Sequence, residues 1–346
     1  MQALRLNSWG HDAELGEVPQ PEPGPGEVLV RIGGAGACHS DLHLMHDFVE
    51  GMLPWGPPFT IGHENAGWIH ALGPGVTGLE VDQPVAVYGP WGCGRCHRCR
   101  QGAENYCEHA AELPAAGGGL GFDGGMAPFQ LIPQSRWVVP LGDLDPVQAA
   151  PLTDAGLTPY HAVKRSLPLL VPGSTAVVIG AGGLGHMAVQ ILAAMTPATI
   201  VAVDQRADAL ERAGHLGAHH GVVAGDDAGA EITELTKGRG ADVVIDLVGA
   251  DATLALGAAV TRSLGHLTIV GIGGGTLPIG FFSVQYEVSV ATTYWGSLPE
   301  LIEVLALAER GLISADVERY TLDDAPEAYR AMAAGELHGR AVVVPS

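Results

Sequence analysis

Four cysteines that lie close together in the sequence form the most specific chemical pattern of the chain. They follow the spacing C-x₂-C-x₂-C-x₇-C, at Cys93, Cys96, Cys99 and Cys107. Four thiolates on one short loop can enclose a tetrahedral zinc ion with no open position, as structural zinc sites require. The same C-x₂-C-x₂-C spacing occurs in ferredoxins, so an iron–sulfur cluster is the alternative. Such a segment has little apolar content and would lose its order without a metal.

A second pattern, G-x-G-x-x-G, is typical of a site that binds a dinucleotide. Gly180, Gly182 and Gly185 follow a short β-branched run, and Asp204 comes 19 residues after the third glycine. The first glycine permits a tight turn, the second lets the backbone approach a pyrophosphate, and the third lets helix and strand pack closely. The N-terminus of the following helix offers unpaired N–H groups to the phosphates. Asp204 would accept hydrogen bonds from the ribose hydroxyls of NAD and would repel the additional phosphate of NADP.

The uncharged region around these glycines has a second interpretation. Residues 174–203 contain no Asp, Glu, Lys or Arg, as in a transmembrane helix. Four glycines within six residues and Pro197 argue against a membrane span. Strands buried on both faces of a parallel sheet are also nearly continuously apolar. A strand, a helix and an acid surround the glycines in the order that a dinucleotide site needs, which also argues against a chance glycine turn.

The elements expected around the glycine motif alternate between strands and helices. Strand patterns cover residues 176–179, 200–203, 221–223, 242–248, 266–271 and 288–292, and helix patterns cover residues 184–195, 207–216, 228–236 and 252–263. This alternation predicts an α/β fold with a doubly wound parallel sheet. Residues 1–37 are expected to be β structure, with a strand at 27–32. Beyond residue 295 the chain is expected to return to this first part, through a helix at 299–310 and a strand at 341–344.

Composition restricts the partners and the compartment of the protein. The chain has 346 residues, which suggests two domains with ample core. Its formal net charge of −21 disfavours nucleic acid and anionic membranes as partners and indicates a well-solvated acidic surface. Met1–Trp9 alternates polar and apolar residues like a strand and does not resemble a signal peptide. Five cysteines, an odd number, then favour a reducing compartment, so a cytoplasmic location is expected.

A longer motif, G-H-E-x₂-G-x₅-G-x₂-V, runs from Gly62 to Val76, and Cys38 precedes it. Together with the cysteine loop and the glycine motif, it resembles the zinc-dependent medium-chain alcohol dehydrogenase family over nearly the whole chain, in particular bacterial NAD-dependent secondary (aryl) alcohol dehydrogenases. The resemblance implies a Rossmann NAD-binding domain at 156–295. It also implies a mainly β, GroES-like catalytic domain at 1–155 and 296–346, and favours zinc over an iron–sulfur cluster in a lobe at about 90–110.

The resemblance implies a catalytic zinc ion bound by Cys38, His63 and Asp154. The family carries its third ligand near this position as Cys, Glu or Asp, and Asp154 matches the aspartate subgroup. A cap of the next helix is the alternative role for Asp154. Glu64 would be an alternate or supporting ligand. Such a zinc keeps one position for water or alcohol. It would stabilise an alkoxide, which transfers hydride to C4 of NAD⁺ and leaves a ketone or an aldehyde.

The resemblance also implies a proton relay from the alcohol through Ser40 and a ribose hydroxyl to His43. The alternative for His43 is an ordinary polar histidine.

The resemblance further implies a set of cofactor contacts. They comprise the glycine loop, the acid that follows it, residues past the strand ends and three single positions: His39, Thr158, Gly180, Gly182, Gly183, Leu184, Gly185, Asp204, Val248, Val270, Ile272 and Arg340. Arg340 matches an arginine that meets the cofactor pyrophosphate. Five large apolar residues match pocket positions and suggest apolar or aryl-bearing secondary alcohols: Trp55, Leu120, Phe282, Tyr294 and Trp295.

The sequence therefore predicts an NAD-dependent zinc alcohol dehydrogenase acting on secondary or primary alcohols, with two zinc ions per chain. A polyol or amino-alcohol dehydrogenase is the alternative within the family, although those subgroups more often have glutamate as the third ligand. A crystallin-like, non-catalytic scaffold is the alternative outside enzymes. That interpretation predicts that at least one metal-ligand position has lost its ligand residue, and every such position retains one. The resemblance further implies a homodimer or homotetramer, with a small-molecule substrate and no nucleic acid or membrane partner.

Overall fold

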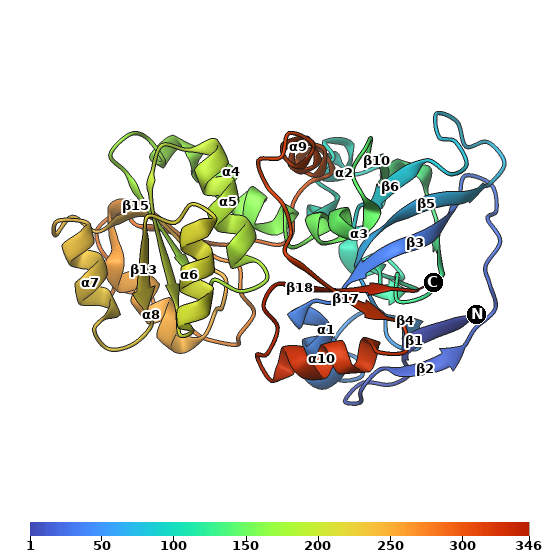
Figure 1. Ribbon diagram of the computed structural model, residues 1–346, viewed down its shortest axis with the longest axis horizontal. Coiled ribbons are helices and arrows are strands. Elements are labelled where there is room, and N and C mark those ends of the chain that lie inside the picture. The colour runs from blue at the N-terminus through green and yellow to red at the C-terminus, as the bar shows by residue number, and fades with distance from the viewer. Residues whose placement is uncertain (346) are drawn as a thin grey trace. The chain divides into compact units, whose positions relative to one another are not determined.

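The computed structural model describes residues 1–345 and divides into two compact units (Figure 1). The first unit comprises Met1–Leu157 together with residues 296–345, and the second is Thr158–Trp295. Within residues 1–345, no helix combines the length and the apolar character needed to cross a membrane.

The second unit is built on one parallel sheet of six strands. These strands are β11 (Thr175–Ile179), β12 (Thr199–Asp204), β13 (His220–Val223), β14 (Ala241–Asp246), β15 (Thr261–Ile269) and β16 (Ser289–Thr292). They pair in parallel in the order β13-β12-β11-β14-β15-β16. This is the strand order of a doubly wound dinucleotide-binding fold, and it confirms the predicted fold class.

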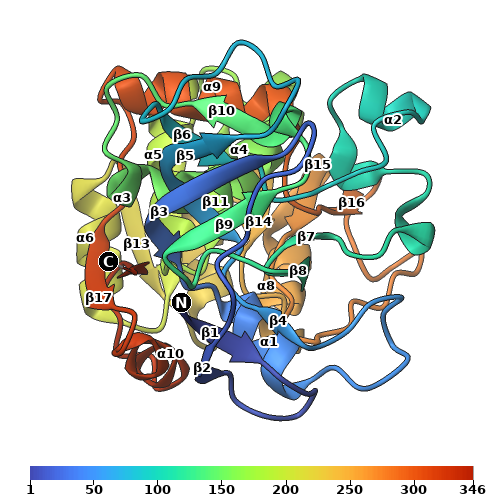
Figure 2. The same ribbon diagram turned by 90° about the vertical axis from the view of Figure 1, so that its right-hand side faces the viewer.

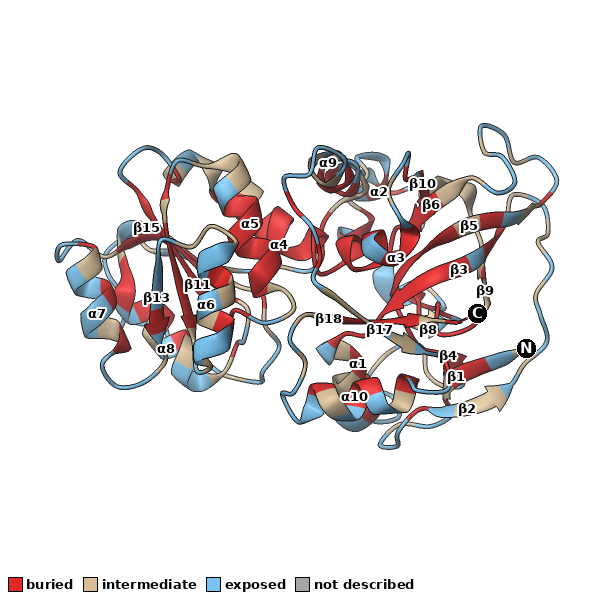
Figure 3. Cartoon of the chain, viewed as in Figure 1, coloured by how far each residue is buried: buried red, intermediate tan, exposed pale blue. Residues whose placement is uncertain are grey.

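Helices cover both faces of this sheet. The helices of the unit are α4 (Leu157–Ser166), α5 (Gly185–Met195), α6 (Ala207–His215), α7 (Ala228–Leu235) and α8 (Asp251–Val260). Alternate residues of a strand point to opposite faces. Val177 and Ile179 accordingly share a core with Ala228 and Ile232 of α7, and α5 and α6 pack on β12. The central strands β11 and β14 are buried along their whole length (Figure 3).

Three predicted elements in this unit have wrong boundaries, and one of them is the strand predicted at 266–271, which is β15 and spans Thr261–Ile269. β14 ends at Asp246 rather than at residue 248, because Asp246 Oδ1 accepts the N–H groups of Val248 (2.9 Å) and Gly249 (3.0 Å) and the chain turns there. The helix predicted to reach residue 263 ends at residue 260. Thr261 already pairs with Ala241 in the sheet, so strand pairing overrides the apolar helical pattern at this point.

The first unit is mainly β, as predicted. Its large sheet contains β3 (Val28–Gly36), β5 (Glu64–Leu72), β6 (Pro84–Val87), β9 (Phe129–Ile132), β10 (Val138–Pro140), β17 (Val317–Thr321) and β18 (Arg340–Val344). The order is β10-β6-β5-β3-β18-β17, and β9 also pairs with β3. A smaller sheet joins β1 (Gln2–Leu6) to β2 (Glu14–Glu17) and β4 (Phe59–Thr60). The last strand of the chain therefore lies beside β3.

Short helices complete the first unit. They are α1 (His39–His46), α2 (His97–Arg100), α3 (Pro146–Ala149), η4 (Ala150–Thr153), α9 (Leu298–Glu309) and α10 (Ala325–Ala333). Helix α9 matches the predicted helix and begins at Ser297, whose side chain accepts the N–H of Glu300 at 3.4 Å. Helix α10 contacts α1, beside which it is drawn in Figure 1, although the two helices lie far apart in the sequence; Figure 2 shows both at the lower end of the turned view, near β1 and β2. Residues of α10 can therefore act on the N-terminal motifs.

Candidate active site

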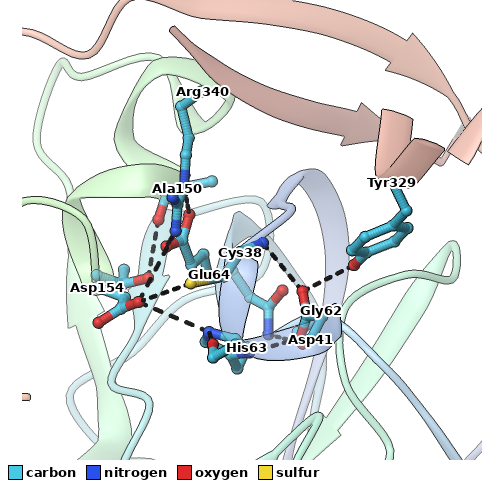
Figure 4. Close-up of polar contacts among 12 residues, drawn as sticks. Cys38, Asp41, Gly62, His63, Glu64, Ala150, Asp154, Tyr329 and Arg340 are labelled. Atoms are coloured by element: carbon cyan, nitrogen blue, oxygen red, sulfur yellow. Dashed lines mark hydrogen bonds and ion pairs between the residues drawn. The ribbon is translucent and has the colours of Figure 1, made fainter. Parts of the chain in front are cut away.

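Four residues predicted to bind the catalytic metal come together in the first unit (Figure 4). The ligand atoms of Cys38, His63, Glu64 and Asp154 lie within 4.8 Å of one another, and all four residues are buried. Cys38 Sγ and His63 Nε2 each lie 3.6 Å from Asp154 Oδ2. A thiolate, an imidazole and a carboxylate are the ligand types that zinc uses in proteins. The donor set therefore fits a zinc ion.

Antiparallel pairing of β3 with β5 brings these residues together. Gly36, at the end of β3, lies opposite Glu64, the first residue of β5. A Cβ atom at Gly36 would lie 2.0 Å from Glu64 Oε2, so only glycine permits this approach. Cys38 follows two residues later as the N-cap of α1, and His63 directly precedes β5. Asp154 comes directly after η4, which packs on β5.

Asp41 holds the imidazole of His63 from its other nitrogen. Asp41 Oδ1 lies 3.0 Å from His63 Nδ1, which leaves Nε2 facing Cys38 and Asp154. The second oxygen of Asp41 accepts the N–H of Cys38 (3.0 Å) and the hydroxyl of Tyr329 (2.8 Å). Burial disfavours the charged imidazole, but the Asp41 charge and hydrogen bonds from the surrounding groups outweigh it and raise the pKa of His63 well above its usual range.

Sequence reasoning missed both Asp41 and Tyr329. For Asp41 a signal existed, because an acid three residues after Cys38 has the spacing of a helix-capping box, and the structure forms that box. Tyr329 belongs to α10, and no local pattern connects it with a residue 288 positions earlier. Burial, followed by the charge of Asp41, raises the pKa of Tyr329 well above its usual range, so this hydroxyl stays a donor.

Arg340 pairs with Glu64 behind the metal-binding residues. Arg340 Nε donates to Glu64 Oε2 over 3.0 Å, and a second guanidinium nitrogen donates to Glu64 Oε1. The same guanidinium lies 3.9 Å from Asp154 Oδ2. Burial raises the pKa of Glu64 to about 7, with the charge of Arg340 opposing the shift. Figure 4 shows Arg340 directed at these carboxylates, whereas the resemblance assigns it to the cofactor pyrophosphate.

Helix α1 carries the three residues assigned to the proton path and its surroundings. Ser40 Oγ lies 3.3 Å from His63 Nε2 and thus borders the donor set. His43, one turn further along, pairs through Nδ1 with Asp47 Oδ2. The rings of His39 and His43 have centroids 5.9 Å apart, and His39 is exposed. The helix therefore leads from the buried donor set toward the surface.

The four cysteines of the lobe form a second donor set. Their sulfur atoms lie within 4.8 Å of one another, and Cys93 Sγ lies 3.9 Å from Cys99 Sγ. A tetrahedron of sulfur atoms around zinc, each bound at about 2.3 Å, has edges of about 3.8 Å. The backbone N–H groups of Cys96, Cys99 and His109 each donate to a cysteine sulfur at 3.4 Å. The donation from Cys99 helps to lower the pKa of Cys96 to about 6, which favours the thiolate that zinc requires.

A buried glutamate that sequence reasoning missed fixes this lobe. Glu104 accepts hydrogen bonds from the N–H of Gly92 (2.7 Å), Trp137 Nε1 (2.8 Å) and Arg136 Nε (2.8 Å). A Cβ atom at Gly92 would lie 2.6 Å from Cys99 Sγ, so glycine is needed beside the sulfur atoms. The carboxylate of Glu104 therefore connects the lobe to Arg136 and Trp137, which lie outside it.

The glycine loop of the second unit has the geometry that its motif predicts. Gly180 has φ +90°, in the left-handed region. A Cβ atom at Gly185 would lie 1.9 Å from the carbonyl oxygen of Gly180, whereas no atom would lie within 4 Å of one at Gly182. The loop thus turns, packs closely at its end and leaves its middle accessible, which suits a pyrophosphate at the N-terminus of α5. Gly183 and Leu184 complete the loop, and both are partly exposed.

Of the other residues assigned to the cofactor, Asp204, Val248, Val270 and Ile272 lie at or just past strand ends of the second unit, whereas His39 and Arg340 belong to the first unit. Asp204 is the last residue of β12, and its Oδ2 accepts the N–H of Ala181 in the glycine loop at 2.7 Å. Val248 and Ile272 are exposed past the ends of β14 and β15, while Val270 is buried. Thr158 lies buried in the first turn of α4.

The five residues assigned to the substrate pocket divide between the two units. Trp55 packs its ring near Trp9 and Phe59, with centroids 6.2 and 5.9 Å apart, and Leu120 is buried in the same unit. Phe282, Tyr294 and Trp295 belong to the second unit. Of these three, Phe282 is 89% exposed and Trp295 is buried.

Models of two protein families match the chain. The alcohol dehydrogenase GroES-like domain matches residues 24–143, and the zinc-binding dehydrogenase model matches residues 183–310. The NAD-dependent alcohol dehydrogenase of Sulfurisphaera tokodaii is 37% identical, with 100% of each chain covered. The D-arabinose 1-dehydrogenase (NADP(+)) of Saccharolobus solfataricus is 35% identical, covering 99% of this chain and 97% of that one.

Solved structures show the same relationship. The alcohol dehydrogenase of Aeropyrum pernix superimposes with a TM-score of 0.92 at 38% identity, covering 100% of both chains. The acetophenone reductase of Geotrichum candidum, solved in complex with NAD, superimposes with a TM-score of 0.85 at 31% identity and covers 99% of this chain and 97% of its own. Each similarity extends through both units.

Proposed function

The chain belongs to the zinc-dependent medium-chain alcohol dehydrogenase family, and we propose that it interconverts apolar, aryl-bearing secondary alcohols and the corresponding ketones. It is an NAD-dependent enzyme with two zinc ions, one held by Cys38, His63 and Asp154 and one by the four cysteines of the lobe. The observation that carries the proposal is the convergence of one sulfur, one imidazole and two carboxylates in a single buried cluster. Burial of such a set of polar and ionisable groups is costly unless it is compensated, and a bound metal ion would supply that compensation.

The residues of the first unit divide the chemical work. Zinc supplies the Lewis acidity that polarises the substrate oxygen. Cys38, His63 and Asp154 bind the metal, and Asp41 keeps His63 Nε2 directed at it. Ser40, beside His63, would take up the proton of the alcohol while its own hydroxyl proton leaves toward the ribose side of the coenzyme site, and His43 would release a proton to water. The pairing of His43 with Asp47 at the end of α1 orients the ring for this last transfer.

The second unit binds the coenzyme that carries the hydride. The open position at Gly182 and the N-terminus of α5 receive the pyrophosphate, and Asp204 binds the ribose hydroxyls. Val248, Val270 and Ile272 lie past the carboxyl ends of their strands, where doubly wound sheets bind their ligands, and would contact the nicotinamide of a bound coenzyme. In this proposal the first unit is the catalytic domain, and the second unit is the coenzyme-binding domain.

The choice of substrate rests on the pocket residues and on one relative. Trp55, Leu120, Tyr294 and Trp295 are apolar or aromatic, which suits a substrate with an aryl group. The relative named acetophenone reductase acts on such a ketone, and its similarity covers nearly the whole chain.

The location and assembly of the protein are inferred from its cysteines and from one sheet edge. None of the five cysteines forms a disulfide, which suits the reducing cytoplasm. The edge strand β16 follows a segment with exposed apolar side chains at Ile279, Phe281, Phe282 and Tyr286. An unpaired strand edge next to apolar surface favours pairing with a second copy of the chain, so we expect a homodimer or a homotetramer.

The experiment is the rate of NADH formation from 1-phenylethanol, measured on the full chain before chelation, after chelation and after zinc repletion. We expect the rate to fall and then return. Asp154→Ala should abolish the rate, while Glu327→Gln, a substitution of an exposed residue on α10, should leave it unchanged. Activity confined to polyols or sugars would overturn the proposed substrate class. No rate with any alcohol, despite bound NADH and two zinc ions, would overturn catalysis itself.

A further inference from the structure

We propose that Asp208 is a second determinant of coenzyme choice, because it engages two arginines that would otherwise bind the 2′-phosphate of NADP. This inference rests on the proposed coenzyme site and adds to the role of Asp204. Whereas Asp204 repels the phosphate directly, Asp208 removes the positive groups that could attract it.

The chain places Arg206 next to the acid that would bind the ribose. Asp204 ends β12, and its Oδ1 accepts the N–H of Arg206 at 2.9 Å. Arg206 is the N-cap residue of α6, so the helix starts directly beyond this hydrogen bond. A guanidinium group thus originates beside the carboxylate that distinguishes NAD from NADP. In doubly wound folds that accept NADP, an arginine in this neighbourhood binds the 2′-phosphate.

One carboxylate holds two guanidinium groups at this place. A terminal nitrogen of Arg206 lies 3.0 Å from Asp208 Oδ2, and a terminal nitrogen of Arg212 lies 3.6 Å from the same oxygen. Side chains of Arg206 and Asp208 are 35% and 48% exposed, so solvent ions and ligands can reach them. Guanidinium groups bind phosphate and carboxylate with the same fork of donors, and the two anions therefore compete for them.

Because of this competition, Asp204 and Asp208 should have coupled effects on the affinity for NADP. With Asp204 replaced, the arginines are still engaged by Asp208, and with Asp208 replaced, the phosphate still meets Asp204. Removal of both leaves Arg206 and the N-terminus of α6 beside the ribose site, with Arg212 further along the same helix, and this arrangement favours a phosphate. The effect of the double substitution on NADP affinity should therefore exceed the product of the single effects.

The experiment measures binding rather than turnover, on the zinc-loaded full chain. Dissociation constants of 5′-ADP and 2′,5′-ADP are determined by calorimetry for the wild type, Asp208→Asn, Asp204→Ala and the double variant. We expect Asp208→Asn to bind 2′,5′-ADP about three- to ten-fold more tightly, with 5′-ADP unchanged, and the gain to shrink at high salt. Asp204→Ala should also shift the ratio of the two constants, and the double variant should shift it most.

Two further variants keep the outcome interpretable. Arg206→Gln added to Asp208→Asn should abolish the gain, because the phosphate loses its donor. Glu327→Gln, which removes a carboxylate partner of an arginine on α10, at a more exposed position, should change neither constant. An unchanged ratio in Asp208→Asn with normal 5′-ADP binding would overturn this inference and leave the proposed function intact, as would a gain that survives Arg206→Gln. Failure of every variant and of the wild type to bind 5′-ADP or NADH would instead overturn the coenzyme site, and this inference with it.

Discussion

Asp41 Oδ1 lies 3.0 Å from His63 Nδ1, and both side chains are almost completely buried. In a buried site this contact decides which ring nitrogen carries the proton. Carboxylates in this position fix the tautomer of a metal-binding histidine and raise the basicity of its other nitrogen. Asp41 is in turn fixed by the hydroxyl of Tyr329 and the N–H of Cys38, so the metal site depends on α10 as well as on its ligands.

Asp41→Asn should weaken zinc binding at the catalytic site by about 10- to 100-fold, because the amide cannot supply the negative charge that supports His63. The measurement is competition with a chromogenic chelator, which reports both zinc ions of the chain. Tyr329→Phe is the matched control, since it removes one hydrogen bond and leaves the carboxylate in place, and should cause a smaller loss. Wild-type affinity in Asp41→Asn would contradict the assigned role.

Arg340→Met should destabilise the metal-free protein by about 3–5 kcal/mol, because it leaves Glu64 buried without its ion partner. Urea unfolding of the chelated protein measures this change. Glu64→Gln together with Arg340→Met should restore part of the loss, because the buried charge is then absent. Equal stability of the single and double variants would argue against the pair as the source of the effect.

Cys96→Ser should destabilise the protein more than it alters the chemistry. The lobe has few apolar contacts beyond its sulfur atoms, so loss of one ligand releases its zinc ion and its order. We expect one zinc ion per chain instead of two and a lower unfolding temperature, with hydride transfer retained below that temperature. A stable variant with full metal content would refute the structural zinc site.

Asp242→Asn should cost about 2 kcal/mol of unfolding free energy at pH 7. Burial alone would raise the pKa of Asp242, but the N–H of Thr175 and the guanidinium groups of Arg262 and Arg239 lower it overall. A carboxylate whose pKa is lower in the folded state stabilises the fold above its unfolded pKa of about 3.9, and this contribution disappears as the pH falls through the folded value. The difference between wild type and variant should therefore shrink toward pH 3 in urea titrations. A difference that stays constant with pH would exclude the ionised carboxylate as its cause.

Much of the fold could be predicted because local patterns and global topology agree. The β-α-β alternation around Gly180 predicted the order of elements in the second unit, and the larger errors were the ends of β14 and α8 and both ends of β15. Helix α1, with the sequence HSDLHLMH, has too few apolar residues to show a helical stripe. It forms because Cys38 and Asp41 cap its start and because α10 packs beside it, and neither cause is visible in a short window of sequence.

The candidate site likewise has residues that the sequence could predict and residues that it could not. The spacing of the four lobe cysteines reveals their chemistry, whereas Cys38, His63 and Asp154 were assigned through the resemblance to a family, and the structure brings each set together. Their supporting residues do not stand in motifs. Tyr329 and Arg340 reach Asp41 and Glu64 across more than 270 residues, and only the pairing of β18 with β3 and the packing of α10 on α1 create these contacts. Single-sequence reasoning has no access to such long-range partners.

The pairing of β18 with β3 also sets an order of maturation during synthesis. The lobe cysteines lie within residues 93–107, so this centre can close around its ion as soon as that short segment has left the ribosome. Glu64, in contrast, receives its guanidinium partner from the first residue of the final strand. A nascent chain that has reached residue 154 therefore carries all four metal-binding groups of the catalytic site, but the carboxylate of Glu64 has no guanidinium partner until β18 has been made and has paired with β3.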